Sequence, residues 1–303
     1  MHVMTVLGPI APADLGFTQP HEHLICDSGW VGGYTIRLPL SEPSLAIEEL
    51  MTFKSAGGRT IVELTNHGLR RDPRALRQIA RATGVNIVMG CGWYRQKNYP
   101  PGFDRLSAND LAEEIVRDLT VGADGTDIRS GIIGEIGVTL DYVSPAEERV
   151  LRAAARAHRR TGATIYTHGE FYPIGTWQLD ILEEEGVDLR RVIVGHMDSY
   201  LDSDYHDAVA RRGAFVAYDT VGRTHIYPDV ARIAMIHRML KLGYLEQLLL
   251  STDRCWRSDL RMYGGAGYDY LLTHFLPRLR QEGISEEQIE IVCIENPRQA
   301  LAF

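Results

Sequence analysis

The chain has 303 residues, of which 24% are charged, and its formal net charge is −8. This length suits one large domain or two modest ones, and the acidic balance argues against a nucleic-acid partner, because phosphate neutralisation needs a basic face. No apolar stretch approaches the roughly 18 residues of a membrane span, and the N-terminus lacks the basic-then-apolar order of a signal peptide. We therefore expect a cytoplasmic protein with no membrane partner.

The four cysteines show no C-x-x-C spacing, so neither a disulfide framework nor a cysteine-rich zinc site is expected. We expect free thiols, buried or partly exposed. The cysteines are Cys26, Cys91, Cys255 and Cys293.

Short runs rich in β-branched residues alternate with longer amphipathic stretches from one end of the chain to the other. Ser144-Pro145-Ala146-Glu147 has the form of a capping box at a helix start, and Gly84 and Gly162 are typical helix ends. The alternation predicts an α/β protein, a single (β/α)₈ TIM barrel over residues 1–303. A doubly wound sheet is disfavoured because neither glycine-rich nucleotide-binding motif is present. The eight predicted strands lie near residues 17–23, 60–65, 86–92, 130–135, 164–168, 192–196, 214–219 and 248–253.

His21 and His23 lie two residues apart in the first predicted strand. Because successive strand side chains point to opposite faces, both imidazoles project to the same side. Neutral imidazole is the commonest metal ligand in proteins, so the pair could form half of a metal site. Two nearby histidines in a chain that has 11 can also be incidental. The pair therefore needs support from other strands.

Further ligand-type side chains end other predicted strands, where the functional residues of TIM barrels gather. A single strand-end His or Asp can be structural, because it can bond a loop carbonyl or cap the next helix. Six such residues together favour a metal centre at the C-terminal face of the barrel. The six are His21, His23, Glu135, His168, His196 and Asp253.

Four imidazoles and two carboxylates exceed the needs of one zinc-like ion, because catalytic sites of that kind take three protein ligands and keep one position open. The set predicts two divalent ions, and Glu135 has the reach to bridge them. A water between two such ions is acidified to hydroxide, and one ion also polarises the bond under attack. Zinc is expected first, but manganese, cobalt, nickel or iron accept the same ligands.

The chain resembles the phosphotriesterase family of the amidohydrolase superfamily over essentially its whole length, and most closely the bacterial phosphotriesterase homology proteins. The motifs that carry the resemblance are His-Glu-His at 21–23, Thr-His-Gly at 167–169, Val-Gly-His-Met-Asp at 194–198, Ser-Thr-Asp at 251–253, the segment 264–273 and Glu-Asn-Pro at 295–297. The resemblance implies that the more buried metal is bound by His21, His23 and Asp253, the more exposed one by His168 and His196, and both by Glu135.

One departure from the best-known members of that family concerns the bridging ligand. Phosphotriesterases proper and the related lactonases use a carboxylated lysine, whereas Lys54, Lys97 and Lys241 are this chain's lysines and none lies near the fourth predicted strand. Glu135 is therefore expected to bridge directly, as in the branch of the homology proteins. This departure weakens the case for organophosphate triesters as natural substrates.

The resulting hypothesis is a hydrolase in which a metal-bridging hydroxide attacks a carbonyl ester, with a lactone that bears an anionic group as the leading substrate. Asp253 is expected to be both a metal ligand and the general base. One alternative is an amidohydrolase of small N-acyl compounds, because the same metals serve that reaction and the glutamate-bridged branch is associated with it. A phosphotriester or aryl ester hydrolase is another. A binding protein without turnover is disfavoured by the complete ligand set.

Residues after the third, seventh and eighth predicted strands are candidates for substrate binding. Arginines there could clamp a carboxylate or phosphate, and Tyr94 could orient the substrate oxygen. Alternatively, these side chains pair with local acids and shape the rim. The candidates are Tyr94, Arg95, Arg223, Arg254 and Arg257. A homodimer is expected from the resemblance. Solvated or capping roles are expected for the other histidines, His2, His67, His158, His206, His225, His237 and His274.

Overall fold

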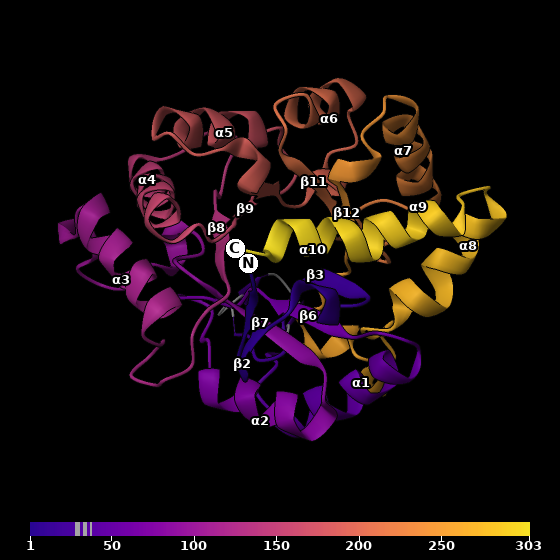
Figure 1. Ribbon diagram of the computed structural model, residues 1–303, viewed down its shortest axis with the longest axis horizontal. Coiled ribbons are helices and arrows are strands. Elements are labelled where there is room, and N and C mark those ends of the chain that lie inside the picture. Colours follow the sequence, from indigo (N-terminus) through magenta and orange to yellow (C-terminus); the bar gives the residue numbers. More distant parts are fainter. Residues whose placement is uncertain (28–30, 33–34, 37) are drawn as a thin grey trace.

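The computed structural model describes residues 1–27, 31–32, 35–36 and 38–303. Eight parallel strands form a nearly closed barrel, and helices surround it (Figure 1). The strands are hydrogen-bonded in the order β12-β11-β10-β9-β8-β7-β6-β3, so the predicted (β/α)₈ barrel is confirmed. Their bounds are β3 (Thr18–Glu22), β6 (Thr60–Glu63), β7 (Asn86–Cys91), β8 (Ile132–Gly137), β9 (Ile165–His168), β10 (Val192–Val194), β11 (Phe215–Tyr218) and β12 (Leu248–Leu250).

Two short hairpins, which the sequence pattern did not predict, accompany the barrel: β1 (Val3–Thr5) with β2 (Gly8–Ile10), and β4 (Val31–Gly32) with β5 (Thr35–Ile36). Strands of two or three residues are too short to show a periodicity. No helix in the described parts of the chain is long and apolar enough to cross a membrane. The helices are α1 (Pro43–Ser55), α2 (Pro73–Thr83), α3 (Ala108–Thr120), α4 (Pro145–Thr161), α5 (Gly175–Glu184), α6 (Ser203–Ala210), α7 (Asp229–Lys241), α8 (Leu276–Gln281), α9 (Glu286–Glu290) and α10 (Asn296–Leu301).

The helix ends follow the local sequence signals. Ser144 and Glu147 form the predicted capping box at the start of α4. Gly84 and Gly162 end α2 and α4 in left-handed backbone conformation, which glycine adopts without a steric penalty from Cβ. The predicted caps are therefore confirmed.

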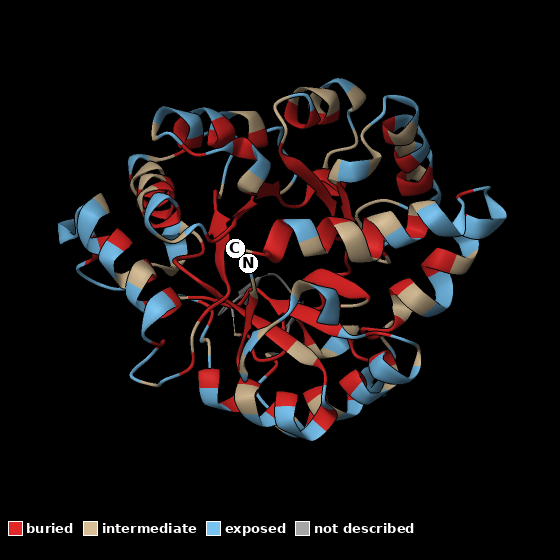
Figure 2. Ribbon diagram, in the orientation of Figure 1, coloured by how far each residue is buried: buried red, intermediate tan, exposed pale blue. Residues whose placement is uncertain are grey.

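Strand side chains alternate between the barrel interior and the layer of helices. Ile193 and Leu249 belong to the interior cluster, whereas their neighbours Val192 and Leu248 pack in the larger cluster that the helices share. Both sets are buried, as Figure 2 shows along the strands. Burying one such side chain contributes about 1.5–3 kcal/mol, so the two apolar layers hold the strand ends in fixed positions.

One end of the barrel is closed by the C-terminal helix. Ala300 and Leu301, at the end of α10, pack in the interior cluster with Val3 and Leu15, and both termini lie beside this end (Figure 1). The hydroxyl of Thr164, just before β9, donates a hydrogen bond to the carbonyl of Ala300. Because this end carries the strand starts, the carboxyl ends of the strands face the opposite end.

The seam between the first and last barrel strands is closed just beyond their carboxyl ends. The amide of Asp253 donates to the carbonyl of His21, and the amide of His23 donates to the carbonyl of Arg254, both at 3.2 Å. The residue between the two histidines, Glu22, reinforces this seam from the other face of β3. Its carboxylate accepts from Gln19 Nε2 (2.6 Å), Ser251 Oγ (2.8 Å), Thr252 N (2.8 Å), Thr252 Oγ1 (2.7 Å) and Arg254 N (2.8 Å).

Candidate metal centre and active site

The structure brings the six predicted ligand side chains together at the carboxyl ends of the barrel strands, and all six are buried. His21, Glu135 and His168 lie within β3, β8 and β9, and β8 runs two residues beyond the predicted end. The other three, His23, His196 and Asp253, lie just after β3, β10 and β12.

His196 and Asp253 follow strands that end earlier than the sequence predicted. β10 stops at Val194 and β12 at Leu250, and the chain then turns sharply. Both residues adopt left-handed backbone conformations, with φ of 55° and 48°. Such conformations are uncommon for residues other than glycine and persist where surrounding structure fixes them. The turns aim these two side chains into the centre.

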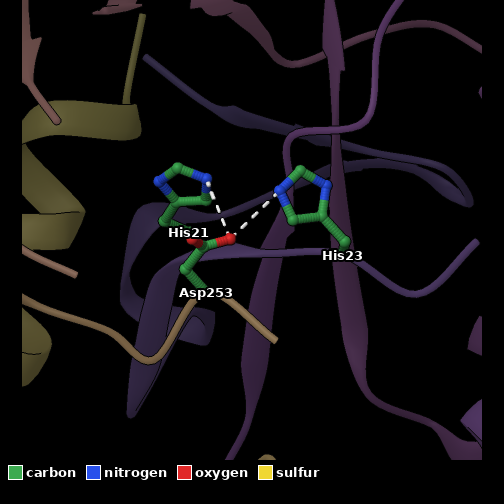
Figure 3. A group of neighbouring side chains, drawn as sticks. All are labelled: His21, His23 and Asp253. Carbon is green, nitrogen blue, oxygen red and sulfur yellow. Dashed lines mark ion pairs between the residues drawn. The ribbon is translucent and has the colours of Figure 1, made fainter. Parts of the chain in front are cut away.

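One group of ligand atoms is formed by His21, His23 and Asp253 (Figure 3). Oδ1 of Asp253 lies 3.7 Å from Nε2 of His21 and 3.3 Å from Nε2 of His23. The three ligand atoms lie within 4.8 Å of one another, so one ion could contact all of them. This is the set that the family resemblance assigns to the more buried metal.

Glu135 lies between the four imidazoles. Its Oε1 is 3.4 Å from Nε2 of His23, and its Oε2 is 3.6 Å from Nε2 of His21. The same Oε2 lies 2.7 Å from Nδ1 of His168 and 3.7 Å from Nε2 of His196. Each carboxylate oxygen therefore faces at least one imidazole, as a bridging ligand requires.

The charge state of Glu135 suits this position. Burial by itself would raise its pKa, but the neighbouring His168 and His21 hold the pKa well below its usual range. The carboxylate is thus ionised and available as a ligand. Burial lowers the pKa of His168, and the neutral imidazole is the form that binds metal.

Asp219, one residue after β11, orients two of the histidines and was not predicted as a site residue. Its Oδ2 lies 2.8 Å from Nδ1 of His21, and its Oδ1 lies 2.8 Å from Nδ1 of His196. Burial alone would raise the pKa of Asp219, but these two histidines hold it well below the usual range. Because an ionised carboxylate only accepts hydrogen bonds, both Nδ1 atoms donate to Asp219, and both Nε2 atoms are directed at the centre.

Nε2 of His21 tests whether the residues fit a metal. It is buried and has no hydrogen-bond partner among the described residues. Buried polar atoms of this kind normally have a partner, and a cation at this point would supply one. His23 is held in the same way, because its Nδ1 lies 2.9 Å from Oγ1 of Thr65 and its Nε2 faces Asp253 and Glu135. The donor set therefore fits divalent cations.

A cavity of about 250 Å³ opens from this centre. Three of the five predicted substrate residues line it, namely Tyr94, Arg95 and Arg223. The sequence analysis did not single out several other lining residues as site residues. They are Cys26, Leu69, Glu170, Phe171, His225, Ile226 and Cys255.

Arg223 contacts the candidate base as well as the cavity. Its Nη2 lies 2.9 Å from Oδ2 of Asp253 and 3.1 Å from Sγ of Cys255, and it also donates to the Asp253 carbonyl. Cys255, like the other three cysteines, is a free thiol, as predicted. The guanidinium of Arg223 is thus already partnered by the metal centre, which leaves it less free to clamp a substrate anion.

The other two arginines do not line the cavity, so their contact with a substrate stays a prediction. Arg254 is buried and donates to the carbonyls of Gly267 and Val221. Arg257 pairs with Glu42 at the rim. In both cases, nearby acceptors outside the cavity hold the guanidinium, which is the alternative that the sequence left open.

A wall of the cavity beside His168 consists of Tyr94, Arg95 and Glu170. The hydroxyl of Tyr94 lies 3.3 Å from Nε2 of His168, and the guanidinium of Arg95 stacks 4.4 Å from the centre of the Tyr94 ring. Oε2 of Glu170 lies 3.6 Å from Nη1 of Arg95 and 3.9 Å from Nε2 of His168. Burial alone would raise the pKa of Glu170, but His168 and His196 hold it below the usual range.

One of the remaining histidines departs from the expected solvated or capping roles. His206, on α6, is fully buried against the Tyr218 hydroxyl and the carbonyls of Met197 and Tyr200. His158 contacts the Ala163 carbonyl at the end of α4 through Nδ1, and His225 is exposed, although it lines the cavity. The residue type alone does not show that His206 faces inward on its helix.

Comparisons with known proteins agree with this geometry. The sequence model of the phosphotriesterase family matches residues 1–301. The chain is 40% identical over 285 residues to the phosphotriesterase homology protein of Escherichia coli (strain K12), covering 94% of this chain and 97% of that protein. It is 33% identical to the N-acetyltaurine hydrolase of Xenopus tropicalis, covering 99% and 98%. The crystal structure of a lactonase from Listeria monocytogenes superposes with a TM-score of 0.92 at 29% identity, covering 100% and 99%.

Proposed function

Because this chain belongs to the phosphotriesterase family, we propose that it is a metal-dependent hydrolase that cleaves the bond between a carbonyl carbon and its leaving heteroatom in a small anionic substrate. One observation carries the proposal. Four imidazoles and two carboxylates converge, buried, at a cavity that Arg95 and Arg223 also line. Arg95 would supply positive charge for an anionic group of the substrate, whereas Arg223 is engaged by Asp253.

We propose two divalent cations for the centre, with zinc first. The more buried cation would be held by His21, His23 and Asp253, the more exposed one by His168 and His196, and both by Glu135. When bound, such ions lower the pKa of a water molecule and polarise a carbonyl oxygen.

Side chains of the protein would transfer the proton and orient the ligands and the substrate. Asp253 takes the proton of the attacking water, because Oδ1 faces the centre while Arg223 holds Oδ2. Asp219 fixes the rings of His21 and His196. The Tyr94 hydroxyl, which lies beside His168, would orient the substrate oxygen.

Two substrate classes are supported by specific observations. Small N-acyl amides are favoured by the match to the N-acetyltaurine hydrolase of Xenopus tropicalis over 99% of the chain. The cavity of about 250 Å³ also suits a compact substrate rather than one with a long acyl chain, because pockets for drug-sized ligands start near 300 Å³. Lactones are the second candidate, supported by the structural match to the Listeria monocytogenes lactonase.

The proposal is tested by measuring kcat/KM of protein loaded with zinc, manganese or cobalt against three substrate panels. The panels are small N-acyl compounds with a carboxylate or sulfonate, lactones, and aryl phosphotriesters, with chelator-treated protein as the control. Metal-dependent cleavage in either carbonyl panel supports the proposal. Absence of turnover in fully metallated protein would point instead to a binding protein, and faster cleavage of phosphotriesters would contradict the carbonyl assignment.

A further inference from the structure

Glu170 is an acidic residue in a cavity that otherwise suits anions. It lies two residues after the end of β9, lines the cavity, and keeps 21% of its side chain exposed there. Its carboxylate is beside His168, on the side of the centre that the family resemblance assigns to the more exposed metal. A carboxylate at this place repels the anionic part of a substrate, so its presence needs a reason in substrate recognition.

The backbone around Glu170 is fixed on both sides. The His168 carbonyl accepts a hydrogen bond from Nε2 of Gln178 at 2.8 Å, and the Phe171 amide donates to Oγ of Ser199 at 3.0 Å. Phe171 has a φ of 65°, a conformation that an aromatic residue adopts only where its surroundings impose it. The backbone that carries Glu170 is therefore held in position before a substrate arrives.

The nearest cationic groups to Glu170 leave it able to accept further hydrogen bonds. Nη1 of Arg95 lies at 3.6 Å and Nε2 of His168 at 3.9 Å, both longer than an ordinary hydrogen bond. An ionised carboxylate has two oxygens and accepts only. A group that binds to Glu170 must therefore be a donor, and under the proposed function the scissile bond would lie in this same cavity.

We propose that Glu170 is a specificity-determining residue that accepts a hydrogen bond from the N–H of a secondary amide at the scissile bond. This inference rests on the proposed function and narrows it to amides. In hydrolysis, water adds to the carbonyl carbon, the C–N bond breaks, and the amine leaves with a proton. The leaving nitrogen carries an N–H throughout, whereas the leaving oxygen of an ester carries only lone pairs, which the Glu170 carboxylate repels. A site built around a donor of this kind rejects the analogue that lacks it.

Three probes differ only at this atom. They are N-acetyltaurine, its N-methyl derivative, which has no N–H, and 2-acetoxyethanesulfonate, in which oxygen replaces the N–H. For Glu170→Ala we expect kcat/KM for N-acetyltaurine to fall about 10- to 100-fold, with the values for the other two rising or falling by less than about threefold. Glu170→Gln, which retains one acceptor oxygen, is expected to lose less. Because each ratio compares substrates in one preparation, changes in metal content or folded fraction cancel.

A binding measurement provides a readout that does not depend on turnover. In protein carrying Asp253→Asn, calorimetric titration is expected to show tighter binding of N-acetyltaurine than of its N-methyl derivative, and adding Glu170→Ala is expected to remove the difference. Glu184→Ala, which changes an exposed glutamate on α5, is the matched control and is expected to alter neither ratio. An equal loss for all three probes in Glu170→Ala overturns the inference. Failure of wild-type protein to cleave any of the three probes while it cleaves lactones would overturn the inference alone, whereas failure on every carbonyl substrate would count against the proposed function itself.

Discussion

Nη2 of Arg223 lies 2.9 Å from Oδ2 of Asp253, whereas Oδ1 of the same carboxylate faces His21 and His23. The two oxygens therefore have separate partners, a guanidinium on one side and the metal centre on the other. Burial alone would raise the pKa of Asp253, but the charge of Arg223 and the adjacent histidines hold it well below its usual range. The candidate base is thus ionised across the physiological pH range.

Replacing Asp253 with asparagine removes the group that takes a proton while keeping an oxygen that can bind metal. We expect kcat to fall about 10²- to 10⁴-fold, the contribution typical of general bases, and much of the metal to remain. Steady-state kinetics and mass-spectrometric metal analysis of the same samples check both halves. Activity within a few fold of the wild type would show that Asp253 is not the base.

Replacing Arg223 with methionine removes the cation beside Asp253, so the pKa of this carboxyl group is expected to rise. The base is active above its pKa, and the acid limb of the pH profile of kcat/KM should therefore move to higher pH. Arg257→Met is the matched control, because Arg257 pairs with Glu42 at the rim and does not line the cavity. An unshifted limb in Arg223→Met would contradict this role.

Asp219→Asn tests the orientation of two ligands by one carboxylate. An asparagine has one acceptor oxygen and can satisfy Nδ1 of only one of His21 and His196. Loss of such a partner typically lowers metal affinity about 10- to 100-fold. Competition with a chromophoric chelator measures the affinities. Tyr166→Phe, which removes only a hydroxyl that donates to Asp219, is expected to have a much smaller effect. Unchanged affinities in Asp219→Asn would refute the assignment.

From the burial of His206 we predict how the free energy of unfolding depends on pH. Burial lowers its pKa in the folded protein, whereas an unfolded histidine titrates near 6.5. Below about pH 6.5 the unfolded chain therefore binds a proton that the native state does not, and the free energy of unfolding falls as pH decreases, by up to about 1.4 kcal/mol per pH unit. Urea denaturation between about pH 5 and 7 measures the slope. It should be shallower in His206→Gln, with both proteins stripped of metal, and equal slopes would contradict the prediction.

The positions of the strands and of the metal-ligand candidates were predictable because they rest on local rules. The alternation of strand side chains places His21 and His23 on one face, and the barrel rule gathers strand ends at one opening. The exact ends of the strands were harder to predict from the sequence. The turns at His196 and Asp253 require left-handed backbone conformations. Such conformations cannot be predicted from the presence of a histidine or an aspartate.

The sequence analysis could not identify residues whose role depends on a partner far away in the chain. Asp219 ended the predicted seventh strand and could have been noticed as a carboxylate in line with the ligands, but a strand-end aspartate also commonly caps a helix. The destinations of Arg254 and Arg257 depended on which acceptors the folded loops bring near them. No sequence motif marked Glu170 as a site residue, because a single glutamate in a loop has no distinguishing pattern.

The seam between β3 and β12 has a consequence for the mechanics of the barrel. His21 and His23 come from one side of this junction and Asp253 from the other. A cation bound by all three would therefore link β3 to the segment that follows β12. Without it, the first and last strands of the barrel would be held by the two backbone bonds, the Glu22 cluster and the bonds of the Ser251 hydroxyl to the backbone of His21. Amide hydrogens along this junction should then exchange faster than those between β7 and β8, whose pairing needs no cation.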